Sequence, residues 1–508
     1  MRPALKNHPA RCSSNRQNCC SFPPARTFWW LNEPSGQTNA RGTAVPGTLT
    51  VSEQRHIKLD LDAGLWHAEP PEPLPWEERP FPAPEKSICG TLGAYGDGGH
   101  VLLDGVGRTD FAFSDDRADP QSYEADVCIT KDSPFNADFD LANFHHLRIE
   151  LVGLEEWLKL DNIQMEDKCL EGSNHEVSVK YKDHSFSYGT PDGTITIESL
   201  ALGANSLGLF YGRLLREASF RQTHWLIYTP ALQSSIRSLR IIFTQMEEFL
   251  ALLLGSYFRL NWPVLVQGTD VTDPWLRLYF FRGSVPEFKP IESFLLTTFD
   301  VLQTSFGDLF SAYKAQSEKY RAAYYLYLAA LRNPLPYPEH EFVNMVWALE
   351  SFHRVKQSRP ATFPSERMQR ILDRFADARD KSDRKWLKAK LKYAEEPSLE
   401  DRIVDTFSAL PLELDEKGLR DFAKRCAQRR NQISHEGGPG GEESYEDFCQ
   451  DVRRLTEAFS YLYHALLLHE IDLGAKTLIR GVTNSVLGNM RTLPAFRRVG
   501  LSMPRTAE

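Results

Sequence analysis

The chain has 508 residues, enough for about two to four domains, and its apolar (42%) and charged (25%) fractions are those of a soluble globular protein. No apolar run reaches the about 18 residues that a membrane-spanning helix needs, so the sequence predicts no membrane partner. The net charge of −9 means that a nucleic acid must be bound by a local basic patch rather than by the whole surface.

Residues 1–54 differ in composition from the rest of the chain. The first fifty residues contain six lysines and arginines against a single acid, Glu33, and they show little apolar periodicity. Their prolines would interrupt the amphipathic helix of a transit peptide. We therefore expect residues 1–54 to be a disordered or wrongly assigned N-terminal extension.

Residues 55–304 are predicted to form a β-rich domain. In "HLRIELVG" the apolar residues Leu147, Ile149 and Leu151 alternate with polar ones, and "HEVSVKYKDHSFSY" alternates in the same way. Turn sequences such as "TPDGT" separate these stretches. A period of two with tight turns favours antiparallel pairing in a sandwich or barrel-like domain. A helix near "SLRIIFTQMEEFLALLL" and a mixed stretch with strands near 262–282 follow within this range.

From residue 305 onward, apolar residues recur at helical spacing. Ser398 and Ser444 each precede acids in a first helical turn and are predicted N-caps. Residues 305–475 are therefore expected to be an all-α bundle and 476–508 a loosely ordered tail, giving an α+β multidomain fold class. The helical stretches are "EHEFVNMVWALESFHRVK", "PSERMQRILDRFADARDK", "SLEDRIVDTFSAL", "LRDFAKRCAQRRNQISH" and "SYEDFCQDVRRLTEAFSYLYHALLLHEI".

The common patterns of metal and cofactor chemistry are missing from the sequence. It has no Walker A loop, no H-E-x-x-H and no G-x-S-x-G, and its eight cysteines form no C-x-x-C pair. His145 and His146 are neighbours on a strand and face opposite sides, while His464 and His469 lack an acidic or thiol partner at ligand spacing. We expect no metal, no cofactor and a cytoplasmic protein with free thiols.

The stretch "RRNQISHEGG", residues 429–438, is the strongest candidate site. An arginine followed by a histidine means little by itself, because Arg2 and His8 match that pattern too. This stretch, however, ends a helix whose single acid is Asp421 and then meets the terminator "EGGPGG". The helix forms a local basic patch from Arg420, Lys424, Arg425, Arg429 and Arg430.

On an ideal helix, the polar residues of this stretch do not all lie on one face. Asn431 and His435 are i, i+4 neighbours on one face. Arg430 is offset from His435 by about 140° on an ideal α-helix, so its side chain must curl round or the helix must loosen. The C-terminal end of a helix favours cationic side chains, including a protonated His435.

These residue types suit cleavage of an RNA phosphodiester without a metal. The 2′-hydroxyl must lose a proton, the 5′-oxygen must gain one, and the phosphate charge must be stabilised. His435 can act as acid or base, Arg430 can bind the phosphate, and Asn431 can orient the histidine or donate to an oxygen. Because one motif supplies one histidine and the reaction needs two proton-transfer groups, a two-fold dimer would complete the site.

The C-terminal region resembles the Apea-like HEPN domain of the HEPN superfamily, through Arg430, Asn431 and His435 in "RRNQISH". The helix "FVNMVWALESFHRV" looks like the first long helix of that family, and "EEPSLEDRIVDTF" is similar to its middle. The β-rich region resembles the N-terminal domain that precedes this HEPN domain in ApeA-type proteins. Together the resemblance covers about residues 55–475.

The resemblance implies a helical bundle that dimerises with its motif helices facing each other. It implies an endoribonuclease that leaves a 2′,3′-cyclic phosphate and acts as a toxin in bacterial anti-phage defence by abortive infection. Arg430, Asn431 and His435 would be catalytic, and Glu350 would brace Arg430 from the facing helix. The N-terminal domain would regulate the nuclease, in response to a phage-derived or cellular trigger.

Three alternatives stay open at this point. Lys424, Arg425 and Arg429 are expected to contact RNA or to support the catalytic residues, yet a basic helix end is also an ordinary solvated feature. A HEPN module without catalytic activity could bind RNA or a protein partner. A carbohydrate- or ligand-binding β domain could use the bundle only for dimerisation.

Overall fold

The computed structural model of the chain describes residues 27–31, 45–51, 57–62, 87–92, 99–108, 120–133, 135, 139–170, 174–210, 213–268, 273–282, 295–332, 337–357, 370–371, 373–374, 382–383, 385–387, 396–485 and 488–503. Within these ranges no helix has the length and apolar character needed to cross a membrane. The chain divides into two compact units. The first consists of Met1–Glu150, Trp225–Phe243 and Leu260–Ser284, and the second of Leu151–His224, Thr244–Arg259 and Val285–Glu508.

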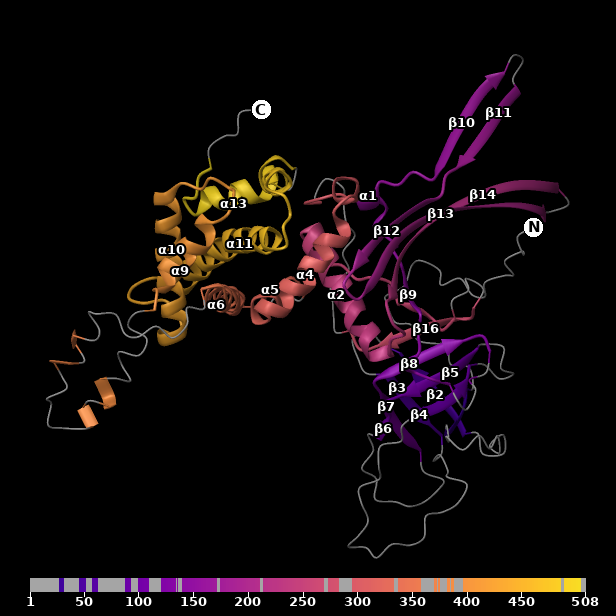
Figure 1. The fold of residues 1–508 in the computed structure, drawn as a ribbon, viewed down its shortest axis with the longest axis horizontal. Helices are drawn as coiled ribbons and strands as arrows, with labels where there is room; N and C mark the ends of the chain where they lie inside the picture. Colours follow the sequence, from indigo (N-terminus) through magenta and orange to yellow (C-terminus); the bar gives the residue numbers. More distant parts are fainter. Residues whose placement is uncertain are drawn as a thin grey trace, which may run out of the picture. The chain divides into compact units, whose positions relative to one another are not determined.

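The first unit is an antiparallel sheet (Figure 1). Its strands follow the order β9-β15-β16-β8-β5-β4-β1-β2-β3-β7-β6, and the last part of β14 pairs with β9. The predicted alternation is confirmed in β9, where Leu147 and Ile149 are buried. The strands are β1 (Thr27–Leu31), β2 (Val45–Thr50), β3 (Ile57–Leu61), β4 (Ser87–Thr91), β5 (His100–Asp104), β6 (Gly107–Arg108), β7 (Gln121–Ala125), β8 (Val127–Lys131), β9 (His146–Glu150), β14 (Arg213–Pro230), β15 (Val264–Val266) and β16 (Trp275–Phe280).

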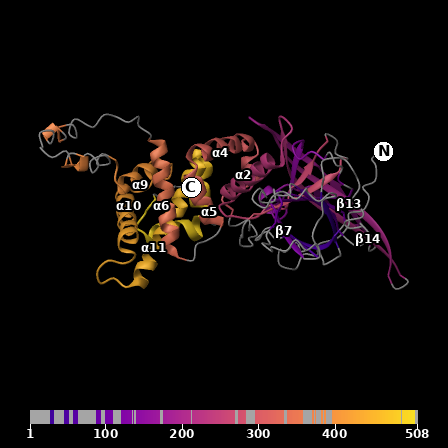
Figure 2. The same cartoon turned by 90° about the horizontal axis from the view of Figure 1, so that it is seen from below.

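This sheet curls around its apolar face, as the indigo and purple strands of Figure 2 show. Strands far apart in the sheet order therefore share one core. Leu49 of β2, Ile88 of β4, Cys128 of β8 and Tyr279 of β16 belong to a single cluster of buried side chains. The curvature agrees with the barrel-like form that the short strands and tight turns predicted.

The second unit begins with two hairpins. Strands β10 (Ile163–Leu170) and β11 (Asn174–Tyr181) form one, and β12 (His184–Thr190) and β13 (Gly193–Phe210) form the other. The turn of the second hairpin is the predicted "TPDGT" sequence. A short helix, α1 (Glu155–Leu158), precedes them.

A buried polar chain joins these hairpins to β14. Gln222 Nε2 donates to His224 Nε2 (3.1 Å), His224 Nδ1 donates to Ser199 Oγ (2.6 Å), and Ser199 Oγ donates to Asn162 Oδ1 (2.5 Å). Burial lowers the pKa of His224, which keeps the ring neutral as this assignment requires. Because Ser199 and Asn162 have 0% exposure, the serine and histidine hold strands together and reach no substrate.

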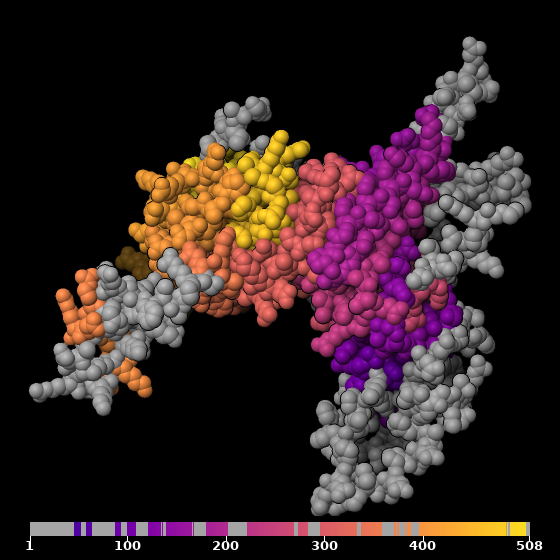
Figure 3. Space-filling model, viewed as in Figure 1, coloured from indigo at the N-terminus to yellow at the C-terminus, as the bar shows by residue number. Residues whose placement is uncertain are grey.

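The remainder of the second unit is helical, and its elements run in colour from pink through orange to yellow in Figure 3. Ser398 and Ser444 are N-caps as predicted, each accepting from a backbone N–H three residues on at 3.1 Å. The elements are α2 (Ile236–Leu254, which starts in the first unit), α3 (Phe299–Leu302), α4 (Phe306–Tyr320), α5 (Ala322–Arg332), α6 (Pro338–Lys356), α9 (Leu399–Ser408), α10 (Glu416–Asn431), η4 (Gln432–Glu436), α11 (Tyr445–Glu470), α12 (Ala475–Ile479), η5 (Arg480–Asn484), η6 (Gly488–Thr492) and α13 (Leu493–Arg498).

The structure corrects two expected boundaries. Residues 1–54 contain β1 and β2, which pair with each other and with neighbouring strands, so they are not merely an extension. The described residues of the expected tail, 476–485 and 488–503, are ordered, because Leu478, Phe496 and Leu501 are buried and Asp415 N donates to Ser502 O (3.0 Å). The compact units also cross the expected border at 304/305. Most of the predicted helix "PSERMQRILDRFADARDK" lies outside the described residues.

His464 of α11 ties the end of α2 to the bundle. Its Nε2 donates to the backbone oxygen of Leu252 (2.8 Å), and its Nδ1 accepts from Tyr327 Oη (2.6 Å). Burial lowers the pKa of this imidazole to about 4. The ring is therefore a neutral connector in the core of the second unit.

We predict that this histidine makes stability depend on pH. In the unfolded chain the imidazole has a pKa near 6.5, so between about pH 6.5 and 4 only the unfolded state binds the proton. The free energy of unfolding should fall across that window, with about 3 kcal/mol from this residue. Urea unfolding measures the loss of unfolding free energy across this pH window. The His464→Gln variant should lose less than the parent. The His340→Gln variant, at an exposed histidine, should lose as much as the parent. Equal falls in all three would contradict the assignment.

Candidate active site

Helix α10 places the candidate residues at its C-terminal end. Asp415 caps its start by accepting from Gly418 N (2.6 Å). Leu419, Phe422 and Cys426 are buried at i, i+3 and i+7, so this face packs into the bundle. The opposite face remains in solvent, with Asn431 at its last position.

The helix loosens between Arg430 and His435. Residues Gln432–Glu436 form a π-turn, and Gly437 then leaves the helix with a φ of 74°. In a π-turn the backbone hydrogen bond joins residues i and i+5, and Arg430 and His435 have this spacing. The turn therefore reduces the angle between the two side chains around the helix axis, which would be about 140° in an α-helix. The sequence left two ways for Arg430 to approach the face of His435, a curled side chain or a loosened helix, and the structure has the loosened helix.

Arg430 lies against Glu350 of α6. Its Nη2 is 3.6 Å from Glu350 Oε2, and its Nη1 donates weakly to Asn431 Oδ1 (3.3 Å). Its Nε is covered and has no hydrogen-bond acceptor within the described ranges. The guanidinium is therefore held in place by a carboxylate, but it keeps donors for an anionic ligand.

His435 and Asn431 are both exposed to solvent. In the described part of the chain, no hydrogen bond or ion pair involves the His435 ring. His435 thus follows Arg430 by one π-turn along the chain, and its ring is open to solvent.

Arg429, the neighbour of Arg430, is fully engaged by carboxylates. Its Nη1 and Nη2 donate to the two oxygens of Glu443 (2.6 Å each), and its Nε donates to Asp451 Oδ2 (2.8 Å). Its guanidinium also stacks over Phe448. The hydrogen bonds that Arg429 donates to Glu443 raise the pKa of Arg429. Arg425 shares Asp451, so both arginines fasten α10 to the start of α11.

The loop between η4 and α11 folds back against the π-turn. Arg429 Nη1 also donates to Gln432 Oε1 (3.0 Å) at the start of the turn. A Cβ at Gly440 would lie 2.8 Å from Glu436 Oε2 and 3.3 Å from Gln432 Nε2, so the loop backbone passes close to the side chains of the π-turn. The hydrogen bond from Arg429 therefore ties the start of the loosened turn to the ion-pair cluster.

Two residues of the predicted basic patch, Arg420 and Lys424, form a solvent-facing stripe along α10 together with Lys417, which the prediction did not include. Lys417, Arg420 and Lys424 are exposed and lie within about 40° of Asn431 around an ideal helix. Arg420 pairs only with the highly exposed Glu416, which leaves its charge largely effective. The cationic surface therefore runs along the same face as the candidate residues.

Trp347 is a feature that the sequence pattern missed. We predicted it on an apolar helical stripe with Val343 and Val346, and both valines are buried. Trp347 instead has 47% exposure. It lies three residues before Glu350, and therefore beside it on the surface of α6. A large apolar side chain thus borders the Glu350–Arg430 pair.

His145, His146 and Cys426 have contacts or surroundings of their own and are not part of this site. His145 contacts the backbone oxygen of Gln267 and the amide of Gln233, and His146 contacts Thr229 (3.0 Å). Burial raises the pKa of the Cys426 thiol, which keeps it from acting as a nucleophile. Within the described residues, no group of three or more metal-binding side chains is present.

Two family models match the chain. The ApeA N-terminal domain 1 model matches residues 26–313, more than half of the sequence, and the Apea-like HEPN model matches residues 343–477. The chain belongs to the ApeA-type HEPN proteins. No curated protein and no solved structure matches it significantly. The HEPN match includes Glu350, Arg430, Asn431 and His435.

The ApeA match also places the first strands in the N-terminal domain. It starts at residue 26, one residue before β1, and it ends within α4. The HEPN match starts inside α6 and ends inside α12. The order of the two domains in this ApeA-type protein confirms the order that the sequence predicted.

We predict that the two adjacent arginines differ in their effect on stability. Arg429→Ala would leave the partly buried Glu443 without its ion pair and Asp451 with Arg425 alone, so the free energy of unfolding should fall by about 3 kcal/mol. Arg430→Ala breaks only a 3.6 Å ion pair, and the loss should stay below about 1 kcal/mol. Urea unfolding measures both. Equal losses would show that Arg430 is a structural residue too.

Proposed function

We propose that this ApeA-type protein is a metal-independent endoribonuclease whose active site contains Arg430, Asn431 and His435. The proposal is based on the difference between two adjacent arginines at the end of α10, Arg429 and Arg430. Arg429 is saturated by Glu443 and Asp451, whereas the two Nη atoms of Arg430 make only a 3.3 Å hydrogen bond to Asn431 and a 3.6 Å ion pair with Glu350, beside an exposed histidine. A helix end with only a structural role would not need a weakly paired arginine beside an exposed histidine.

The chemistry follows from these groups. The 2′-oxygen attacks the adjacent phosphorus, the bond from phosphorus to the 5′-oxygen breaks, and a 2′,3′-cyclic phosphate forms. One imidazole takes the proton of the 2′-hydroxyl, and a second, protonated imidazole gives a proton to the leaving 5′-oxygen. Arg430 stabilises the charge on the phosphate oxygens, and Glu350 holds the guanidinium in position.

A second copy of the chain would supply the second imidazole. Two features of the surface support this arrangement. His435 is exposed rather than buried in its own bundle, and Trp347 offers apolar surface beside Glu350. We infer a two-fold dimer through the HEPN domain in which these surfaces face each other, with RNA following the cationic stripe of Lys417, Arg420 and Lys424.

The N-terminal domain would control this activity. A toxic nuclease needs restraint, and we infer that the ApeA N-terminal domain responds to a phage-derived or cellular trigger during abortive infection. The observation behind this inference is the domain order itself, with the β-rich domain directly ahead of the HEPN domain.

His435→Ala and Arg430→Ala should each reduce RNA cleavage by at least about 100-fold in buffer with a metal chelator, because each removes a group needed in the transition state. The measurement is cleavage of a labelled RNA, with sequencing of the ends. His469→Ala and the exposed Arg497→Ala serve as controls and should cleave at the parental rate. Unchanged cleavage in both test variants would remove this site from the mechanism. RNA binding without cleavage by the parent would favour a non-catalytic HEPN module.

Trp347→Glu should convert the dimer to a monomer and abolish cleavage at micromolar concentration, because it places a charge in the inferred interface. Light scattering gives the mass, and the same RNA assay gives the activity. Trp386→Glu is the matched control, since Trp386 has 62% exposure and belongs to neither α6 nor α10. A monomer that still cleaves RNA would refute the two-histidine scheme.

A further inference from the structure

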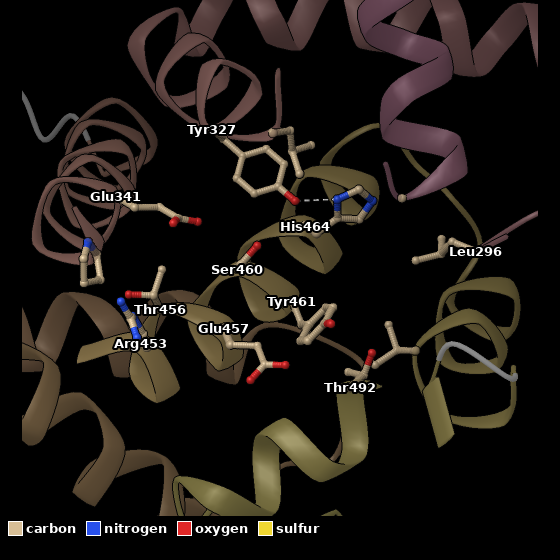
Figure 4. Close-up of a pocket in the computed structure, with 14 residues that line it drawn as sticks. Leu296, Tyr327, Glu341, Arg453, Thr456, Glu457, Ser460, Tyr461, His464 and Thr492 are labelled. Carbon is tan, nitrogen blue, oxygen red and sulfur yellow. Dashed lines mark hydrogen bonds between the residues drawn. The ribbon is translucent and has the colours of Figure 1, made fainter. Parts of the chain in front are cut away.

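The second unit contains a cavity of about 440 Å³, separate from the candidate active site (Figure 4). Its size falls in the range of about 300–1,000 Å³ that is typical of small-molecule sites. Glu341 and Glu350 are nine residues apart on α6 and therefore project from opposite sides of that helix. The cavity lies on the Glu341 side, between α5, α6 and α11, with Leu296, Val482 and Thr492 at its other end.

Several polar side chains in the cavity wall already have partners. Tyr327 Oη donates to His464 Nδ1 (2.6 Å), and Thr456 Oγ1 donates to the backbone oxygen of Val452 (2.7 Å). Glu457 pairs with Arg498 (2.6 Å). These groups shape the wall and contribute little to binding a ligand.

Three groups in the wall remain unused. Glu341, Arg453 and Tyr461 have no ion pair or side-chain hydrogen bond to another residue within the described ranges. Glu341 and Arg453 carry opposite charges and lie on neighbouring helices, yet no contact within 4.0 Å joins them. Burial raises the pKa of the half-buried Glu341 carboxyl, in line with the absence of a neighbouring cation among the described residues.

The three groups without partners, Glu341, Arg453 and Tyr461, indicate which chemical groups a ligand of this cavity would carry. A carboxylate only accepts hydrogen bonds, through two oxygens side by side, so it fits a ligand with two adjacent N–H donors. A separate guanidinium fits an anionic group, and phosphate is the anion that it binds best. The ring of Tyr461 projects into the cavity and can stack on a flat heterocycle (Figure 4). Guanine presents adjacent N1–H and N2–H donors on its base-pairing edge, which adenine, cytosine and uracil do not.

We propose that this cavity binds a guanine mononucleotide, with the base on Glu341 and Tyr461 and the phosphate on Arg453. The site is independent of the proposed nuclease chemistry, because none of its residues contacts Arg430 or His435. It is also preformed, since its walls are three helices that the core already holds in place.

The test is calorimetric titration of the full-length chain with GMP. The Arg430→Ala variant should bind GMP as tightly as the parent, which separates this cavity from the candidate active site. Glu341→Gln should weaken GMP binding at least tenfold, because the amide replaces one acceptor oxygen with a donor. Glu442→Gln, at an exposed glutamate outside the cavity, should bind normally.

Two further ligands locate the phosphate and the base. Arg453→Met should weaken GMP at least tenfold but leave guanosine unchanged, and AMP should bind at least tenfold more weakly than GMP. RNA cleavage by Glu341→Gln should equal that of the parent, so failure of the cavity proposal and of the nuclease proposal can be told apart. Absence of heat with GMP at millimolar concentration, equal affinity for AMP, or loss of binding in Arg430→Ala would each overturn the proposal.

Discussion

The ion-pair cluster of Arg429 with Glu443 and Asp451 is the constraint on which the candidate site depends. Three arginines, 425, 429 and 430, crowd the last turns of α10, where like charges repel one another. The two carboxylates neutralise Arg425 and Arg429, and they pin the start of α11 and the glycine loop against the helix end. This fixed frame allows the π-turn to persist and leaves Arg430 as the remaining cation of the three beside His435.

Local sequence patterns anticipated much of this arrangement. The alternation of Leu147 and Ile149, the caps at Ser398 and Ser444 and the helix end at "EGGPGG" are all decided by a few neighbouring residues. The need for a loosened helix also followed from spacing alone. Such features are predictable because the determining interactions lie within one or two turns of the residue concerned.

Features decided by distant residues were not predictable. Arg429 and Arg430 look alike in the sequence, and they are distinguished by acids 14 and 22 residues away, across a turn. Trp347 follows the helical period of its buried neighbours, yet it has 47% exposure among the described residues, and the period alone does not show which positions a distant element will cover. The short helices α12 and α13 are held by burial of Leu478 and Phe496 rather than by their own periodicity. In residues 1–54, the two short strands are concealed by a background rich in proline and serine.

The π-turn has a consequence for the motif itself. An α-helix carrying one π-turn contains one residue more than the same length of regular helix, so it acts as an insertion absorbed without breaking the backbone. Regular winding or π winding can therefore bring an arginine and a histidine together at different separations along the chain. The number of residues between them measures how the helix is wound at its end, and a motif defined by a fixed separation would overlook equivalent sites that are wound differently.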